Sequence, residues 1–178
     1  GFDDEDLQRL ANEISRRLGA NLVKGDSNTL TTRKLSDLTG SGSRVIVVFD
    51  TNSSVIDGSN GIHKLSALGL VNSYADSEDY GSMRDDQFRK LRENAGKNFL
   101  LSWTLTQKND STFAKSFMGL DSIERLAGVA NSRTFEVVDH VREKKLYPNI
   151  FMNDFSLARS EDVSGMTVCT EVNKQRLK

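Results

Sequence analysis

Apolar residues along the chain recur first at helical spacing and then in short strand-like runs. Residues 2–18 repeat apolar positions on one helical face, and Gly19 follows as a stop signal. Acidic residues crowd the start of this segment, where the helix dipole favours negative charge. We therefore expect an amphipathic helix over residues 2–18. A polar loop with one short helical turn, near residues 32–38, is expected over residues 20–43.

Four short apolar runs follow, and each is typical of a strand in a parallel sheet. They cover residues 44–50, 68–74, 99–105 and 149–155. The first run is rich in β-branched residues and ends in an acid, as expected for a strand that is buried on both faces. The polar residues that come after it, 51–62, predict a long loop.

Helical patterns come after the later runs and predict the connections between strands. They cover residues 82–94, 121–146 and 161–177, and the middle pattern contains an expected break near Asn131. Strands that alternate with helices in this way indicate parallel βα units. Four units cannot close a barrel of about eight strands. The pattern therefore leaves a compact open sheet or half of a barrel, and residues 1–178 are expected to form one α/β domain.

Polar and aromatic side chains stand where these predicted strands end. Because the carboxyl ends of parallel strands meet at one edge, we expect Asp50, Tyr74 and Asp154 to converge on a common rim. Carboxylates, amides and an aromatic face suit a polyol ligand. The alternative is that strand ends are polar because they meet water. Trp103 lies in an otherwise apolar strand, which favours a place in the core.

Composition narrows the possible partners. The 178-residue chain has a net charge of −1, so no bulk basic field holds nucleic acid or an anionic membrane. Cys169 is the only cysteine, which excludes a disulfide within the chain. With His63 and His140 as the only histidines, a zinc cluster is not expected. We interpret His63 as a loop residue and His140 as a surface residue of a helix. No run reaches the ~20 apolar residues that span a bilayer.

Several motifs in a fixed order resemble the X-type domain of phosphatidylinositol-specific phospholipase C. The most specific is Phe-Leu-Leu-Ser-Trp-Thr-Leu-Thr-Gln at residues 99–107, which is similar to the seventh strand of the secreted bacterial and fungal-type members. The other matching passages are residues 29–48, 72–87, 126–131 and 148–155. Together they cover about residues 28–177.

The resemblance implies a fold and a chemistry. Family members are distorted (β/α) barrels of the TIM type that cleave a phosphodiester next to inositol. The inositol 2-hydroxyl attacks phosphorus while one histidine removes its proton and a second protonates the departing glycerol oxygen. Both family histidines, and the arginine or calcium ligands, lie in the first half of the barrel. Neither His63 nor His140 matches them, so the resemblance implies the C-terminal half of a barrel whose first half is not in this chain.

The resemblance also implies roles for single residues. Tyr74 matches the tyrosine whose ring packs against inositol, and Asp154 matches the last-strand carboxylate that supports a catalytic histidine. Asn72 stands where bacterial relatives often hold an acidic acceptor for an inositol hydroxyl. Asp50 and Trp103 complete the substrate-side set, although Asp50 stands near a position that is basic in some relatives. The structural alternatives are that Tyr74 closes the end of the barrel and that Asp154 caps the last helix.

These matches predict part of a secreted, phospholipase C-like hydrolase of lipid metabolism. Its expected partners are a phosphoinositide or an inositol-containing glycolipid, peripheral contact with a membrane, and a histidine-bearing half, supplied as a separate chain or replaced by a second copy in a homodimer. No cofactor is expected in this chain, and it is an enzyme only when completed. The alternative is a catalytically inactive lipid- or polyol-binding module with a half-barrel fold. A glycerophosphodiesterase is less consistent, because no Glu-x-Asp cluster stands at a strand end to hold its metal.

Overall fold

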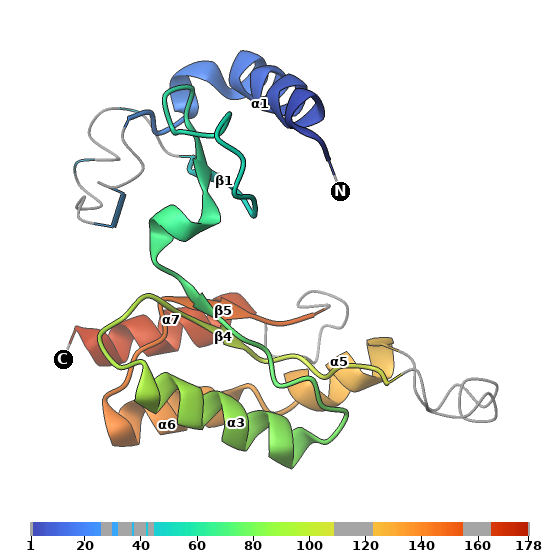
Figure 1. The fold of residues 1–178 in the computed structure, drawn as a ribbon. Helices are drawn as coiled ribbons and strands as arrows, with labels where there is room; N and C mark the ends of the chain where they lie inside the picture. Colours follow the sequence, from blue (N-terminus) through green and yellow to red (C-terminus); the bar gives the residue numbers. More distant parts are fainter. Residues whose placement is uncertain are drawn as a thin grey trace. The chain divides into compact units, whose positions relative to one another are not determined.

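The computed structural model describes residues 2–25, 30–31, 37, 42, 45–108, 123–154 and 165–177. The chain divides into two compact units, Gly1–Leu70 and Val71–Lys178, shown in Figure 1. Every strand pair among the described residues is parallel, which confirms the predicted mixed α/β class. The described strands form one sheet of two strands and one of three, and they do not close a barrel.

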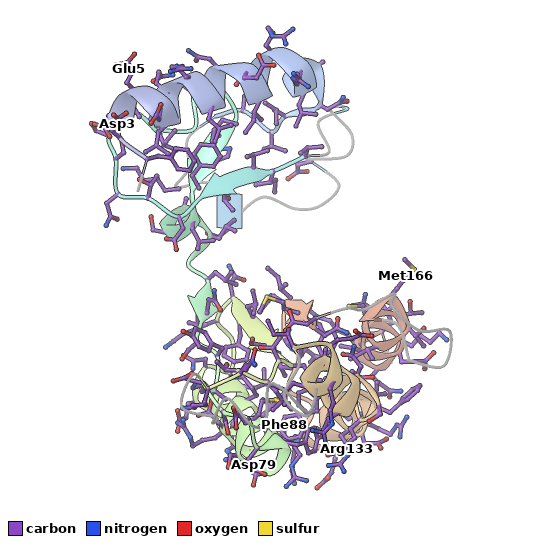
Figure 2. All side chains as sticks on the ribbon, turned by 90° about the vertical axis from the view of Figure 1, so that its right-hand side faces the viewer. Asp3, Glu5, Asp79, Phe88, Arg133 and Met166 are labelled. Atoms are coloured by element: carbon purple, nitrogen blue, oxygen red, sulfur yellow. The ribbon has the colours of Figure 1, made fainter. Side chains whose placement is uncertain are left out.

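The first unit packs one amphipathic helix against a short sheet. The helix α1 covers Asp4–Leu18, as predicted, and the side chain of Asp3 caps it by accepting a 2.8 Å hydrogen bond from the Asp6 amide (Figure 2). A 3₁₀ turn, η1, follows at Gly19–Asn21. The buried core of this unit consists of Ala11, Leu22, Ile56 and Ile62.

The sheet of the first unit contains a strand that the sequence did not predict. The strand β1, Val47–Phe49, pairs in parallel with β2, Ile62–Lys64, which begins where the predicted loop ends. The β1 side chains are half-buried, so the expectation of a strand buried on both faces is wrong. The 3₁₀ turn η3, Leu65–Leu68, occupies the start of the second predicted strand. The helical turn expected near residues 32–38 lies mostly outside the described residues.

The second unit follows the predicted alternation of strands and helices. Its elements are β3 Val71–Asn72, α3 Tyr80–Glu93, β4 Phe99–Ser102, α5 Ile123–Asn131, α6 Phe135–Lys144, β5 Ile150–Met152 and α7 Gly165–Arg176. The break expected near Asn131 is confirmed, because α5 ends there and α6 begins four residues later. None of the helices among the described residues combines the length and apolarity that crossing a bilayer requires.

The strands of the second unit lie side by side in the order in which they occur in the chain, β3-β4-β5. Right-handed crossovers that all step in one direction place their helices on the same face of a sheet. The core agrees with this winding, because one cluster joins β4 with α3, α5, α6 and α7. Its buried members include Met83, Leu91, Leu101, Ala130, Val137, Val141, Val168 and Val172. The four helices therefore share one side of the sheet.

The other face of this sheet carries a second set of side chains. Asn72, Leu100 and Ile150 stand in register across the three strands, and Ser102 stands in register with Met152. Side chains in register on parallel strands point to the same face. The central strand is buried on both faces, but the flanking strand β5 leaves Ile150 41% and Met152 39% exposed. We call these five residues the second face.

Candidate functional site

The carboxyl ends of β3, β4 and β5 form one edge of the second unit. The amide of Trp103, just after β4, donates a 2.8 Å hydrogen bond to the Met152 carbonyl on β5. The amide of Thr106 donates a 2.9 Å hydrogen bond to the carbonyl of Ser77, in the segment after β3. Because all three strands run the same way, these bonds hold their ends together. We call residues 72–77, 103–106 and 153–154 the rim.

A buried amide from α3 ties the rim at Ser73 to Ser102, the last residue of β4. Gln87 has no exposed surface. Its Nε2 donates to the carbonyl of Ser73 at 2.9 Å, and its Oε1 accepts from the amide of Ser102 at 2.9 Å. It lies between Met83 and Leu91 on the buried stripe of the helix. A glutamine at i+4 and i−4 from buried apolar residues is the sequence signal that could have identified this bridge.

Tyr74 is held by its main chain while its ring is exposed. The Lys90 ammonium donates to the carbonyls of Ser73 and Tyr74 at 3.2 and 3.0 Å, and it pairs with the Asp86 carboxylate at 2.6 Å. The residue as a whole is 59% exposed. An aromatic ring that is presented to solvent on a fixed backbone can stack on the flat apolar face of a ligand.

Asp154 lies directly after β5 and is held by a second buried amide. Asn131, at the end of α5, is 1% exposed. Its Nδ2 donates to the Asp154 carbonyl at 2.8 Å, and its Oδ1 accepts from Asn153 Nδ2 at 2.9 Å. These bonds fix the main chain of Asp154 and leave its carboxylate, on a half-buried residue, at the rim. The predicted start of the helix that Asp154 would cap, near residue 160, lies outside the described residues.

Trp103 belongs to the core, which corrects its assignment to the substrate-binding set. The side chain has no exposed surface, and its Nε1 donates to the Ala130 carbonyl at 2.9 Å. Its ring packs edge-on against Tyr80, with centroids 5.8 Å apart, and against Phe88 at 5.5 Å. The guanidinium of Arg133 covers the Tyr80 ring at 4.4 Å. Phe88 and Arg133, labelled in Figure 2, reach this cluster from α3 and from the turn between α5 and α6.

Asp50 and His63 both belong to the first unit. Asp50 follows β1 and is exposed, and β1 pairs with β2 rather than with any strand of the rim. The expectation that it would terminate a strand next to that of Tyr74 is therefore wrong. His63 lies on β2 with no exposed surface, and its Nε2 is 2.8 Å from the Val23 carbonyl. The interpretation of His63 as a loop residue is also wrong.

His140 is packed rather than free on the helix surface. Its ring stacks on Phe88 with centroids 3.9 Å apart and the planes inclined by 6°. Burial, together with the positive charge of Lys144, lowers the pKa of His140 below its usual value. Its Nε2 is buried and accepts no hydrogen bond from the described residues. Neither histidine of the chain is one of the rim residues.

Within the part of the chain that the structure describes, no group of three or more His, Cys, Asp or Glu could hold a metal ion. The rim offers a different chemistry. It combines an exposed aromatic ring, the exposed amide of Asn72 and the carboxylate of Asp154 on main-chain supports fixed by Gln87 and Asn131. This set can hydrogen-bond hydroxyl groups and stack on a ring.

Comparisons of the chain with models of protein families, with curated proteins and with solved structures give no match. The resemblance to phosphatidylinositol-specific phospholipase C therefore stays a prediction from the motifs.

Proposed function

We propose that the chain supplies the substrate side of a phosphatidylinositol-specific phospholipase C-like phosphodiesterase. One observation carries the proposal: three parallel strands in chain order, with all four helices on one face, align Tyr74 and Asp154 on their carboxyl edge. A sheet wound in one direction can continue at both edges and close into a (β/α) barrel, whose sites lie at this edge. A half-barrel is therefore the finer architecture that we propose for this unit.

The rim residues have distinct roles in this function. The exposed Tyr74 ring packs against the cyclitol, and the Asn72 amide hydrogen-bonds one of its hydroxyls. The Asp154 carboxylate accepts a hydrogen bond from a histidine of the completing half. It thereby fixes the ring tautomer and stabilises the imidazolium that forms when the 2-hydroxyl loses its proton. The chain's own residues position the substrate and the base, and the attacking oxygen belongs to the substrate.

The second face supports the need for a completing half. Ile150 and Met152 are apolar and only about 60% covered, with 41% and 39% of their surfaces exposed. The corresponding face in a closed barrel is filled by layers of side chains from the other strands. A histidine-bearing half that covers this face would therefore bury apolar surface and bring acid–base groups to the rim together.

A second candidate function is a catalytically inactive polyol-binding module. The positions of the two histidines favour it, because neither is at the rim. His63 is buried against the Val23 carbonyl, and His140 is stacked on Phe88. Both functions require inositol to bind at the rim, and they differ in whether a completed barrel turns over phosphatidylinositol.

Binding at the rim is tested with the neutral ligand myo-inositol. We expect Tyr74→Ala to weaken its binding to the full chain about fivefold, because a stacked ring contributes about 0.5–1.5 kcal/mol. Tyr74→Phe, which keeps the ring, and Phe135→Ala, which removes an exposed aromatic ring from α6, should change the affinity less than about twofold. Chemical-shift titration measures each affinity. A chain that shows no saturable binding, or that loses it equally in all three variants, refutes both functions.

A further inference from the structure

A polar pocket of about 340 Å³ lies at the opposite edge of the sheet from the rim. It is lined by Leu91 of α3, by residues 94–98, which precede β4, by residues 145–147 and 149, which precede β5, and by Arg176 at the end of α7. Figure 1 shows the last turns of α3, α6 and α7 at this same end of the second unit.

Among the residues that the structure describes, the wall of the pocket contains three cations and no carboxylate. Lys97, Lys145 and Arg176 all belong to its wall and are exposed. Lys97 donates to the Asn94 side chain at 3.2 Å, and the Arg176 guanidinium lies 5.9 Å from the Tyr147 ring centre. None of the three has an ion pair with a described residue. We call Lys97, Lys145 and Arg176 with the surrounding loops the basic pocket.

Several cations elsewhere on the same unit have carboxylate partners, although Arg92 and Arg133 do not pair with a described residue. Arg142 pairs with Asp139 at 2.8 Å, and Arg89 pairs with Asp86 and Glu93, each at 2.7 Å. What distinguishes the basic pocket is that three such cations line one cavity, in a chain whose net charge is −1.

The ends of three helices explain only part of this charge. A helix C-terminus carries roughly half a negative charge, so α3, α6 and α7 together offset about 1.5 of the three positive charges. Some of these helix-end carbonyls are already bonded. The Asn94 amide and side chain both donate to the Lys90 carbonyl, and the Lys145 amide donates to the Val141 carbonyl. The pocket therefore keeps a net positive charge that the negative ends of the three helices do not offset.

The pocket also offers amide donors beside the cations. The Oδ1 of Asn149 accepts from the Phe99 amide at 2.9 Å, so the nitrogen of the same side chain is oriented away from that bond. Three cations around one or more amide groups form the donor set that binds phosphate oxygens, which accept several charge-assisted hydrogen bonds at once. A single carboxylate would use only part of this set.

We propose that the basic pocket binds a multiply charged phosphate ligand. This site is separate from the rim and does not depend on the function proposed for the rim. The shared chemistry, a cluster of phosphate groups, occurs in soluble polyphosphates and in the head groups of phosphorylated lipids. Because the three cations are exposed, binding weakens as salt screens them.

Calorimetric titration of the full chain with sodium tripolyphosphate, in about 50 mM salt, tests the proposal. The variant Lys97→Gln/Arg176→Gln is expected to bind about tenfold more weakly or worse, because two charge-assisted contacts are lost. The matched control, Arg89→Gln/Arg142→Gln, removes the same charge from ion-paired positions and should change the affinity less than about twofold. Lys97→Arg, which keeps the charge, should retain binding.

Absence of saturable binding by the unmodified chain, or an equal loss in the pocket variant and the control, would overturn the proposal. A second arm identifies the source of the phosphate. In this arm the chain is sedimented with phosphatidylcholine vesicles that carry a bisphosphorylated phosphoinositide. If sedimentation depends on Lys97 and Arg176, the ligand is a lipid head group. If it does not, the ligand is a soluble polyphosphate. A negative result for the basic pocket does not bear on the function proposed for the rim. That function is tested with myo-inositol, which carries no charge and so does not need the basic pocket.

Discussion

Trp103→Ala is expected to destabilise the second unit by about 3–5 kcal/mol, the largest effect of any substitution considered. The side chain is completely buried and packs against the rings of Tyr80 and Phe88. Truncation leaves a cavity between β4 and α3 and removes the Nε1 donor from the Ala130 carbonyl. The surrounding helices share this core, so they cannot collapse into the space without moving one another.

Urea unfolding followed by far-UV circular dichroism measures this cost, because Trp103 is the only tryptophan and its fluorescence is lost in the variant. Trp103→Phe keeps an aromatic ring but loses the hydrogen bond, and should cost less than Trp103→Ala. Phe135→Ala removes a ring that is 46% exposed and should cost within about 0.5 kcal/mol. A cost below about 1 kcal/mol for Trp103→Ala would show that this residue is not the centre of the core.

Gln87→Leu is expected to destabilise the same unit by about 1–3 kcal/mol and to loosen the rim. Leucine has a similar size but cannot replace the bonds to the Ser73 carbonyl and the Ser102 amide. The Ser73 carbonyl keeps its hydrogen bond from the Lys90 ammonium, so the main cost comes from the buried Ser102 amide. A buried main-chain group left without a partner costs about 1–3 kcal/mol, partly offset here by added apolar burial.

Hydrogen exchange gives the local readout for this variant. The Ser102 amide, which donates to Gln87 in a fully buried setting, should exchange faster by about tenfold or more than in the unmodified chain. Gln175→Leu, at a half-buried position of α7, is the control and should leave both stability and Ser102 exchange nearly unchanged. Unchanged protection of Ser102 in Gln87→Leu would contradict the bridge.

The elements that the sequence predicted well are those whose signals are local. The helix α1 follows from apolar spacing and from the acidic residues before and within its first turn, of which Asp3 makes the cap. The strand β4 follows from an uninterrupted apolar run, and the break between α5 and α6 falls beside Asn131 as expected. In each case neighbouring residues contain the whole signal, so no knowledge of distant contacts was required.

The missed elements depend on distant partners. The strand β2 is three residues long and includes His63 and Lys64, so its pattern alone does not distinguish it from a loop. Its strand state comes from pairing with β1, which also removes Asp50 from the sheet of Tyr74. Which strands pair is a property of the tertiary fold, and the apolar runs predicted strands without predicting their neighbours.

The residues of the candidate site also divide into those that local signals indicated and those that depend on distant contacts. Strand ends indicated Tyr74 and Asp154, because the carboxyl edge of a parallel sheet is a general location for sites. Gln87 bonds to the main chain of Ser73, next to Tyr74, and Asn131 bonds to that of Asp154. Both amides come from helices and were recognisable only as polar residues at buried helical positions. The sequence of its strand left Trp103 open to assignment either to the core or to the site. Its complete burial in the structure places it in the core.

Phosphatidylinositol cleavage by a reconstituted barrel tests the proposed substrate-side role most directly. The full chain is mixed with the histidine-bearing half of a phosphatidylinositol-specific phospholipase C, complex formation is confirmed by native mass, and inositol phosphate release is measured. We expect release only from the mixture, and a loss of about 10–100-fold with Asp154→Asn, because this substitution removes the carboxylate that we propose to orient the histidine. A stable complex that releases no inositol phosphate, or an Asp154→Asn mixture as active as the original, would contradict this role.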